Sequence, residues 1–268
     1  MLDQIVANAP VYLLICGRCF ALVMTIPLFS LRNVPRISKV AFTGYLAYLV
    51  FPHVNFSIYA PYLAGGAISL QFVLLLAGEV LLGIITGFYV TIIFSAFSTA
   101  GQFFAFQMGF SASEVYDALS QVENPLMGQF FNLIAMLIFL QNHWAQRLFA
   151  RALVSSFDSL SAFSIVAGQE KILRFLLGGL SNLFFDAFVI ALPIMGTLLL
   201  INVAMGILSK AAPMMNLMSE GFPTMILVSF FIISVLMPNL CEYFSHSFDG
   251  AFTALERLYA SIATGGRP

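Results

Sequence analysis

The stretch ISLQFVLLLAGEVLLGIITGFYVTIIFSAFS, residues 68–98, contains one charged side chain, Glu79, in an otherwise apolar run. In the longer segment of residues 40–113, Glu79 is again the only Asp, Glu, Lys or Arg, although 9% of the whole chain is charged. An ionised side chain at the centre of a bilayer costs about 2.5–3.5 kcal/mol on insertion scales, whereas a soluble core does not exclude charge over so long a run. The segment therefore predicts a membrane protein and makes its few embedded charges the first candidates for function.

The composition favours the same class. Apolar residues make up 60% of the chain, the mean hydropathy is +0.97, and the formal net charge is −1. Without a basic block, the sequence gives no reason to expect a nucleic-acid partner. The apolar stretches lack the alternating polar pattern of a membrane barrel. We therefore predict an all-α membrane protein with about six apolar segments that form helical hairpins, at residues 11–31, 40–60, 68–98, 126–142, 172–208 and 222–240.

Two of these stretches, 68–98 and 172–208, are longer than one span requires. Gly83 and Gly87 interrupt the first, and Pro193 interrupts the second. Basic residues flank several stretches, whereas the loop that follows residue 98 carries acids and no Lys or Arg. The positive-inside rule then places both ends of each long stretch on one side of the membrane. We therefore expect a hairpin or a kinked double pass within each of them.

The end of the chain has the period of an amphipathic helix. Its large apolar side chains recur every three or four residues, and charged side chains fall on the other side. The apolar set is Phe244, Phe248, Phe252, Leu255 and Tyr259, and the charged set is Glu242, Asp249, Glu256 and Arg257. Such a helix lies on a membrane or a partner, or it packs back on its own bundle, and the sequence leaves both open.

Motifs of enzyme chemistry are missing. Cys16 and Cys19 form a C-x-x-C inside an apolar segment, and Cys241 is the only other cysteine. Because zinc needs further ligands and redox pairs sit at a helix start beside a strand, two buried small residues are the favoured interpretation. The three histidines are scattered, and neither a phosphate-binding loop nor a nucleophile motif occurs. We expect no enzyme activity, no metal and no cofactor.

Four ionisable side chains lie closest to membrane-depth sequence, namely Arg18, Glu79, Asp186 and Lys210. An embedded carboxylate is either a proton or ion site or one half of a buried pair. Pairing in support of assembly is the favoured hypothesis, and a proton role is the alternative.

The residues Gly83-Ile84-Ile85-Thr86-Gly87 form a G-x-x-x-G, with Gly78 and Gly101 nearby. Small residues at this spacing let helix backbones approach closely in a lipid environment. We expect these glycines to mark tight helix packing, either within the chain or between subunits.

The segment GQFFAFQMGFSASE, Gly101 to Glu114, mixes aromatic residues, amides, Met and glycine and leads into a polar stretch that ends at Pro125. Irregular backbone at membrane depth survives only beside protein or water. The segment could therefore line or plug a passage, and a plain connector outside the membrane is the alternative.

An ordered set of motifs resembles the FliR family of flagellar export proteins, whose relatives in virulence type III secretion are the SctT group. These motifs are Pro27–Ser30, Val34–Lys39, Gly78–Phe88, Thr99–Gln102, Gln107–Ser111, Ala191–Pro193, Asn202, Gly206–Pro213 and Gly221–Pro223. Two positions depart from the family pattern. Ala118 follows Asp117 where family members often have Asp-Pro, and Met214 follows Pro213 where Gln is common.

The resemblance implies a subunit of the flagellar type III export gate in the bacterial inner membrane, at the flagellar basal body. The implied partners are FliP and FliQ in a closed helical assembly, proteins similar to FlhB and FlhA, membrane lipid, and the unfolded flagellar proteins that are exported. It also divides the chain into a FliP-like region, 1–210, and a FliQ-like hairpin with an amphipathic tail, 211–268.

The resemblance further implies a plug at about residues 106–124 that seals the channel before export. Its gate residues would be Phe106, Gln107, Met108, Gly109, Phe110 and Ser111. Glycine gives the backbone freedom to move aside. In such a subunit an assembly role for Glu79 is favoured over a proton role.

Three other functions stay open at this level. The first is the virulence-secretion counterpart of the same subunit. The second is a small-solute secondary transporter that uses Glu79 and Asp186, which predicts inverted repeats that the sequence does not show convincingly. The third is a purely structural scaffold.

Overall fold

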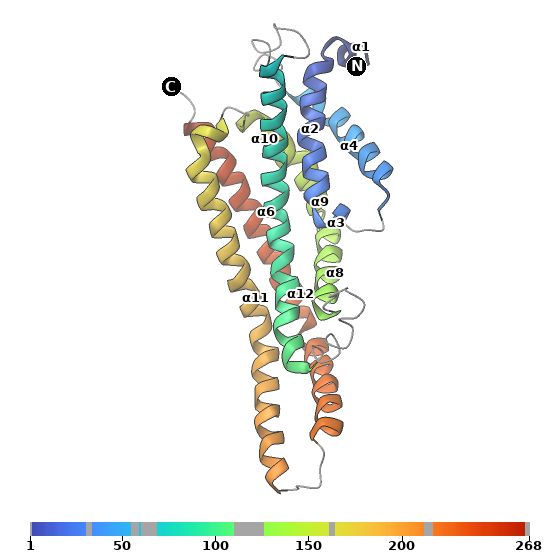
Figure 1. The fold of residues 1–268 in the computed structure, drawn as a ribbon, viewed down its shortest axis with the longest axis vertical. Coiled ribbons are helices and arrows are strands. Elements are labelled where there is room, and N and C mark those ends of the chain that lie inside the picture. Colours follow the sequence, from blue (N-terminus) through green and yellow to red (C-terminus); the bar gives the residue numbers. More distant parts are fainter. Residues whose placement is uncertain are drawn as a thin grey trace. The chain divides into compact units, whose positions relative to one another are not determined.

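The computed structural model of the chain describes residues 2–30, 34–54, 59, 69–109, 126–160, 164–211 and 217–265. Nearly all of these residues are helical, and no strand occurs among them, so the prediction of an all-α protein is confirmed. The helices (Figure 1) are α1 (Leu2–Ala7), α2 (Ala9–Thr25), α3 (Pro27–Ser30), α4 (Arg36–Val50), η1 (Phe51–His53), α6 (Leu70–Met108), α8 (Leu126–Gln141), α9 (Trp144–Gln146), the π-helical η4 (Arg147–Ala152), α10 (Leu153–Ser159), α11 (Ser164–Ala211) and α12 (Leu217–Gly265).

The helices form two compact units. Unit 1 combines three parts of the chain, namely Met1–Ile92, His143–Gly179 and Gly250–Pro268. Unit 2 combines two parts, namely Ile93–Asn142 and Leu180–Asp249. The long helices α6, α11 and α12 contribute to both units. Each unit contains residues from before and after position 210, so a division there stays a prediction from the resemblance.

Prolines set the ends of the short helices. α2 ends at Thr25, and Ile26, which precedes Pro27, is extended at φ −70° and ψ 136°. A residue before proline is pushed out of the helical region by the proline ring, so the break falls there. α4 begins directly after Pro35 and passes into the single turn of η1 at Phe51-Pro52.

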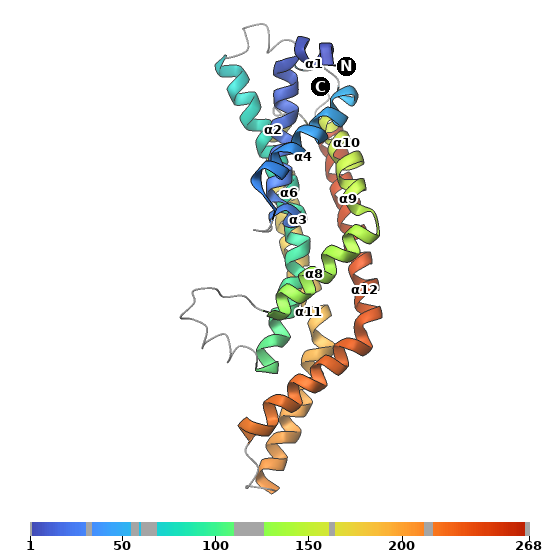
Figure 2. The same cartoon turned by 90° about the vertical axis from the view of Figure 1, so that its right-hand side faces the viewer.

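In unit 1, α4 lies beside α2 (Figures 1 and 2). The Tyr12 hydroxyl of α2 donates a hydrogen bond to the Gly44 carbonyl of α4 at 3.1 Å. The Phe29 and Phe42 rings stack with centroids 4.9 Å apart. These contacts turn the first two apolar stretches into a helical pair.

Unit 2 is built around aromatic side chains. The Phe97 and Phe244 ring centroids lie 4.2 Å apart, and those of Phe94 and Phe248 lie 5.1 Å apart. Phe139 of α8 joins this cluster at 5.3 Å from Phe94. The core of unit 2 therefore joins α6, α8 and α12 through phenylalanine packing, whose edge-to-face and tilted geometries are the favourable ones.

The predicted reversals within residues 68–98 and 172–208 are wrong. α6 is one helix of 39 residues that runs through Gly83 and Gly87, and α11 is one helix of 48 residues that contains Pro193. Glycine inside a helix costs only about 1 kcal/mol relative to alanine, and close packing offsets that cost. Pro193 removes one backbone donor, and α11 continues beyond it.

In the part of the chain that the structure describes, three of the six apolar stretches are helices of bilayer length. Among the described residues, three helical segments are long and apolar enough to cross a membrane: Leu70–Met108, Gly168–Ala211 and Pro223–Ile262. α2 and α8 are shorter, at 17 and 16 residues, and α4 has 15. Proline-defined ends keep α2 and α4 short, because the run of helical hydrogen bonds stops there whatever the hydropathy of the sequence.

The predicted amphipathic helix exists as the last part of α12, and its apolar side chains are buried within the chain. Phe244 and Phe248 belong to the core of unit 2, whereas Leu255 and Tyr259 are buried in unit 1. Of the two alternatives, packing on the chain's own bundle is therefore the one that the structure shows.

Candidate functional site

A buried ion pair joins α2 to α6 inside unit 1. Arg18 Nη2 lies 2.5 Å from Glu79 Oε2, and Arg18 Nε donates a hydrogen bond to the same oxygen at 2.6 Å. The two side chains are 1% and 0% exposed. The structure thus brings together two of the four ionisable residues singled out from the sequence.

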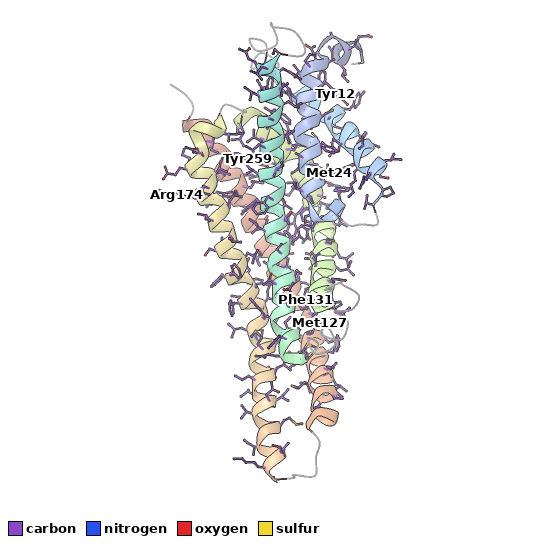
Figure 3. The ribbon with its side chains drawn as sticks, viewed as in Figure 1. Tyr12, Met24, Met127, Phe131, Arg174 and Tyr259 are labelled. Carbon is purple, nitrogen blue, oxygen red and sulfur yellow. The ribbon has the colours of Figure 1, made fainter. Side chains whose placement is uncertain are left out.

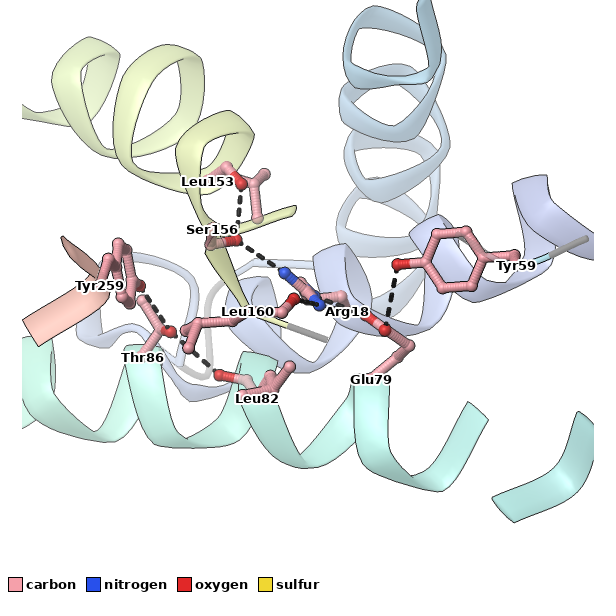
Figure 4. Close-up of polar contacts among 9 residues, drawn as sticks. All are labelled: Arg18, Tyr59, Glu79, Leu82, Thr86, Leu153, Ser156, Leu160 and Tyr259. Carbon is pink, nitrogen blue, oxygen red and sulfur yellow. Dashed lines mark hydrogen bonds and ion pairs between the residues drawn. The ribbon is translucent and has the colours of Figure 1, made fainter. Parts of the chain in front are cut away.

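The rest of the Arg18 guanidinium holds the end of α10 (Figure 4). Its Nη1 donates to Ser156 Oγ, and its Nη2 donates to the Leu160 carbonyl, both at 2.9 Å. Its carbon lies 3.9 Å from the centroid of the Phe157 ring. The last carbonyls of a helix have no partner within it and carry a partial negative charge. Arg18 therefore supplies a cation and hydrogen bonds where α10 ends.

Glu79 has a second partner in Tyr59, which lies between η1 and α6. The Tyr59 hydroxyl donates to Glu79 Oε1 at 3.2 Å (Figure 4). Burial first, and the charge of Glu79 second, raise the pKa of Tyr59 above its usual range. The phenol is therefore held in its protonated form, the form that donates to the carboxylate.

The contribution of this network to stability is that of a buried pair of opposite charges with additional hydrogen bonds. Taking two charges out of water is costly, and good geometry with additional hydrogen bonds offsets the cost. Removing one partner of such a pair typically costs about 3–5 kcal/mol, because the other charge is left buried without compensation. The arrangement suits a structural clamp between α2, α6 and α10.

The G-x-x-x-G glycines face α2 within the same chain. A Cβ at Gly83 would collide with the Arg18 carbonyl oxygen and lie 2.8 Å from the Ala21 Cβ. A Cβ at Gly87 would collide with Thr25 Oγ1 and lie 3.2 Å from the Leu22 carbonyl oxygen. Both positions therefore need glycine for the close approach of α2 to α6. The half-buried Gly78 lies one residue before Glu79.

Beside the ion pair, two hydrogen bonds hold the end of α12 against α6 in unit 1. The hydroxyls of Thr86 and Tyr259 lie 2.9 Å apart, both buried, and the Tyr89 hydroxyl donates to the Ala251 carbonyl at 3.3 Å. The polar groups of this helix contact are thus satisfied within the unit.

Unit 2 has its own close helix contact where Gly101 of α6 meets α8. A Cβ at Gly101 would lie 2.6 Å from the Met127 carbonyl oxygen. The Phe104 and Phe131 rings pack beside it with centroids 5.1 Å apart. Figure 3 labels Met127 and Phe131 next to the end of α6. The last turns of α6 are therefore anchored on α8.

The gate residues predicted from the resemblance begin in this last turn of α6. Met108 is fully buried, whereas Phe106 is 74% exposed, so the structure separates these two apolar side chains. Gly109 has φ 84°, a left-handed conformation that glycine adopts without strain, and α6 ends there. Among the described residues, the buried Gln107 Oε1 has no hydrogen-bond partner. Phe110, Ser111 and residues 112–124 lie outside the described residues.

Among the interactions of the described residues, none joins Asp186 or Lys210 to the Arg18–Glu79 pair. Asp186 is half-buried in unit 2 and accepts hydrogen bonds from the hydroxyls of Tyr243 and Ser247, each at 2.8 Å. Lys210 is exposed near the end of α11. Cys16 and Cys19 are free thiols, half-buried and buried, and the described residues contain no cluster suited to hold a metal ion.

Several network residues have no signal in the sequence. Ser156, Phe157 and Leu160 lie far from Arg18 along the chain, and Tyr59 is one of nine tyrosines. Only an alignment in which these positions change together with Arg18 or Glu79 would single them out. The buried contact of Thr86 with Tyr259 likewise has no signal in the sequence.

The chain matches the family described as bacterial export proteins, family 1, over residues 9–251. It belongs to this family. It is 30% identical to the flagellar biosynthetic protein FliR of Bacillus subtilis over 97% of this chain and 99% of that protein, and 27% identical to FliR of Escherichia coli over 91% of each. It is also 29% identical to the surface presentation of antigens protein SpaR of Shigella flexneri, over 62% of this chain and 63% of that protein.

This membership confirms the resemblance to FliR proteins and to their virulence-secretion relatives. A bacterial export protein with helices of membrane-spanning length and composition is a membrane protein of an export apparatus. The family is one of export proteins, and the matches give no support to the secondary-transporter interpretation.

Proposed function

We propose that this bacterial export protein is a subunit of the flagellar type III export gate and forms a channel for unfolded flagellar proteins together with FliP and FliQ. The observation that carries the proposal is similarity to flagellar relatives over nearly the full length of both proteins. The virulence relative matches a smaller part of the chain. The proposed location is the inner membrane at the flagellar basal body, beside FlhB-like and FlhA-like proteins.

In this proposal the chain has no enzyme activity of its own, and its parts have mechanical roles. The Arg18–Glu79 network and the Gly83 contact keep unit 1 rigid for assembly, which is the proposed role of Glu79. Gly101 and its neighbours fix the base of a plug at about residues 106–124. Gly109, already in a left-handed conformation, is the point from which the plug would swing. A seal is needed because an open pore of polypeptide width would leak ions.

The test of this function is native mass spectrometry of the chain co-expressed with candidate FliP and FliQ proteins and extracted in mild detergent. The expected result is a defined complex that contains one copy of this chain. A free monomer or a symmetric homodimer under conditions in which the candidate partners assemble with another FliR protein would contradict the proposal. Restored swimming in a flagellated bacterium that lacks its own FliR, and not restored virulence secretion, would separate the flagellar from the virulence function.

A further inference from the structure

Asp186 is an acid in the interior of the long helix α11, and within the part of the chain that the structure describes no cation lies against it. Its two carboxylate oxygens accept hydrogen bonds from the hydroxyls of Tyr243 and Ser247, each at 2.8 Å. Both donors are neutral, and no ion pair joins Asp186 to a described Lys, Arg or His. Along α11 itself, no Lys or Arg occurs between Arg174 and Lys210.

The carboxylate keeps acceptor capacity for a cation. A carboxylate has about four lone-pair sites, and the two hydroxyls occupy two of them. The other embedded acid, Glu79, has the same kind of neutral donor in Tyr59 and, in addition, the guanidinium of Arg18. The neutral donors of Asp186 complete neither its hydrogen bonding nor its charge balance. A Lys or Arg side chain would supply both, in a charge-assisted hydrogen bond.

The surface around Asp186 is apolar and exposed. Phe184, Phe185 and Phe188 of the same helix are 51%, 66% and 50% exposed. Asn182, one helical turn before Asp186, is an exposed amide. Acyl chains would cover the phenylalanines, but they offer no hydrogen bond to the acid or the amide. A protein surface that has both apolar and polar groups would cover all of them.

The carboxylate is held in place before any partner binds. Tyr243 and Ser247 lie one turn apart on α12, which is antiparallel to α11 within unit 2 (Figures 1 and 2). Phe244 and Phe248, which follow them in the chain, are fully buried in the phenylalanine core of this unit. A group that is already ordered loses little freedom on binding, so more of its interaction contributes to affinity.

We infer that Asp186 anchors a partner subunit: an apolar helix of another membrane protein lies on this face of α11 and places a Lys or Arg side chain against the carboxylate. Charge complementarity favours the basic side chain, and the exposed phenylalanines nearby favour an apolar helix that carries it and excludes water from the pair. The inference rests on one part of the proposed function, the assembly of the chain with other subunits of an export apparatus. It does not depend on whether that apparatus is flagellar.

The test is purification of the tagged full-length chain in mild detergent from the bacterium that makes it. Quantitative mass spectrometry counts the copies of each accompanying membrane protein per copy of this chain. The identity of these proteins tests the proposed function, and the dependence of their amounts on Asp186 tests the inference. Asp186→Asn keeps the size and removes the charge, and Asp186→Glu keeps the charge. Glu242→Gln, at an exposed acid of α12, is the matched control.

We expect Asp186→Asn to lower the amount of at least one accompanying subunit about tenfold or more, because truncating one partner of a desolvated charge pair speeds dissociation. Asp186→Glu should recover part of this amount, and Glu242→Gln should stay within about twofold of the wild type. Tyr243→Phe combined with Ser247→Ala leaves the charge in place and should lose less than Asp186→Asn.

Unchanged recovery of every subunit with Asp186→Asn would overturn the inference. Equal losses in Asp186→Asn and in the double variant of Tyr243 and Ser247 would also overturn it, since Asp186 would then act only as a clamp between α11 and α12.

Charge reversal identifies the partner side chain. Asp186→Arg places like charges opposite each other and should abolish recovery of the anchored subunit. Second changes that restore recovery should replace one Lys or Arg in an apolar helix of that subunit by an acidic or neutral residue. Restoration only by changes within this chain would contradict the inference, because the counterpart of the carboxylate would then lie inside the protein.

Discussion

Arg18 of α2 and Glu79 of α6 form a buried ion pair directly beside the point where the Arg18 backbone meets Gly83. The same residue thus contacts α6 twice, through its carbonyl oxygen at the glycine and through its guanidinium at the carboxylate. The close helix approach and the buried charge pair depend on each other. A change in the packing of α2 on α6 alters the geometry of the ion pair, and loss of the pair leaves a charge in a tight apolar contact.

A single substitution in the Arg18–Glu79 pair should lower the stability of unit 1 more than a substitution of both residues. Glu79→Gln or Arg18→Met leaves one buried group without its charged partner, and we expect a loss of about 3–5 kcal/mol in the stability of unit 1. The double substitution Arg18→Met with Glu79→Leu should recover part of it, because replacing both members of a buried pair by apolar groups is often nearly neutral. The recovery is partial because the hydrogen bonds of Arg18 to α10 and of Tyr59 to Glu79 stay lost. Thermal unfolding and the yield of assembled complex measure both effects.

The same variants distinguish assembly from proton transfer. If Glu79 serves assembly, export should follow complex yield in all three variants. Normal assembly of Glu79→Gln with lost export would contradict the assembly role and favour a proton role. Arg174→Met, which removes an exposed i,i+4 pair with Glu170, is the control and should change stability by less than about 0.5 kcal/mol.

Alanine at Gly83 should push α2 away from α6. The new Cβ would meet backbone, the Arg18 carbonyl oxygen, which cannot rotate aside as a side chain can. We expect a loss of at least about 1–3 kcal/mol, the usual cost of overpacking. Gly178→Ala is the matched control, since nothing lies within 4 Å of its added Cβ in α11. It should be neutral or stabilising by roughly 0.5–1 kcal/mol through helix propensity, and equal effects at both sites would argue against close packing as the role of Gly83.

Features that follow from a physical constraint on a whole segment could be predicted from the sequence. The exclusion of charge around Glu79 predicted membrane-type helices, and three helical segments have that length and composition. The period of the last apolar residues predicted the amphipathic end of α12. These features depend on composition and spacing, which the sequence contains in full.

Features that depend on contacts between residues far apart in the sequence could not be predicted. Gly83 and Gly87 look like helix breakers locally, but they are contact points for α2, so α6 continues through them. Arg18 and Glu79 were singled out by their charge, whereas Ser156 and Leu160 are bound to Arg18 across 138 and 142 positions of the chain. No local sequence pattern indicates that this serine and this leucine contact Arg18. The network could be known only once the fold had brought them together.

The end of α12 should loosen when its hydroxyl contact is removed. Tyr259→Phe deletes the hydrogen bond to Thr86, and the Thr86 hydroxyl keeps its bond to the Leu82 carbonyl at 2.9 Å. We expect a stability loss of about 0.5–1.5 kcal/mol, the net value of one neutral hydrogen bond. Faster hydrogen exchange confined to residues 250–262 would report it. Tyr45→Phe, at a position that is 59% exposed, serves as the control, and a response of equal size there would show that the Thr86 contact contributes nothing.

The plug proposal makes its sharpest prediction at Gly109. At φ 84° a β-branched residue is strongly disfavoured, whereas asparagine tolerates the left-handed region. Gly109→Val should therefore displace the segment after α6 and raise the ion leak through the assembled complex, and Gly109→Asn should stay close to wild type. Deletion of residues 110–120 should give the largest leak while complex assembly is kept. The leak is measured as dissipation of a potassium gradient in vesicles that contain the complex. If the deletion assembles normally and its leak equals that of the wild type, residues 106–124 are a connector and the channel is sealed elsewhere.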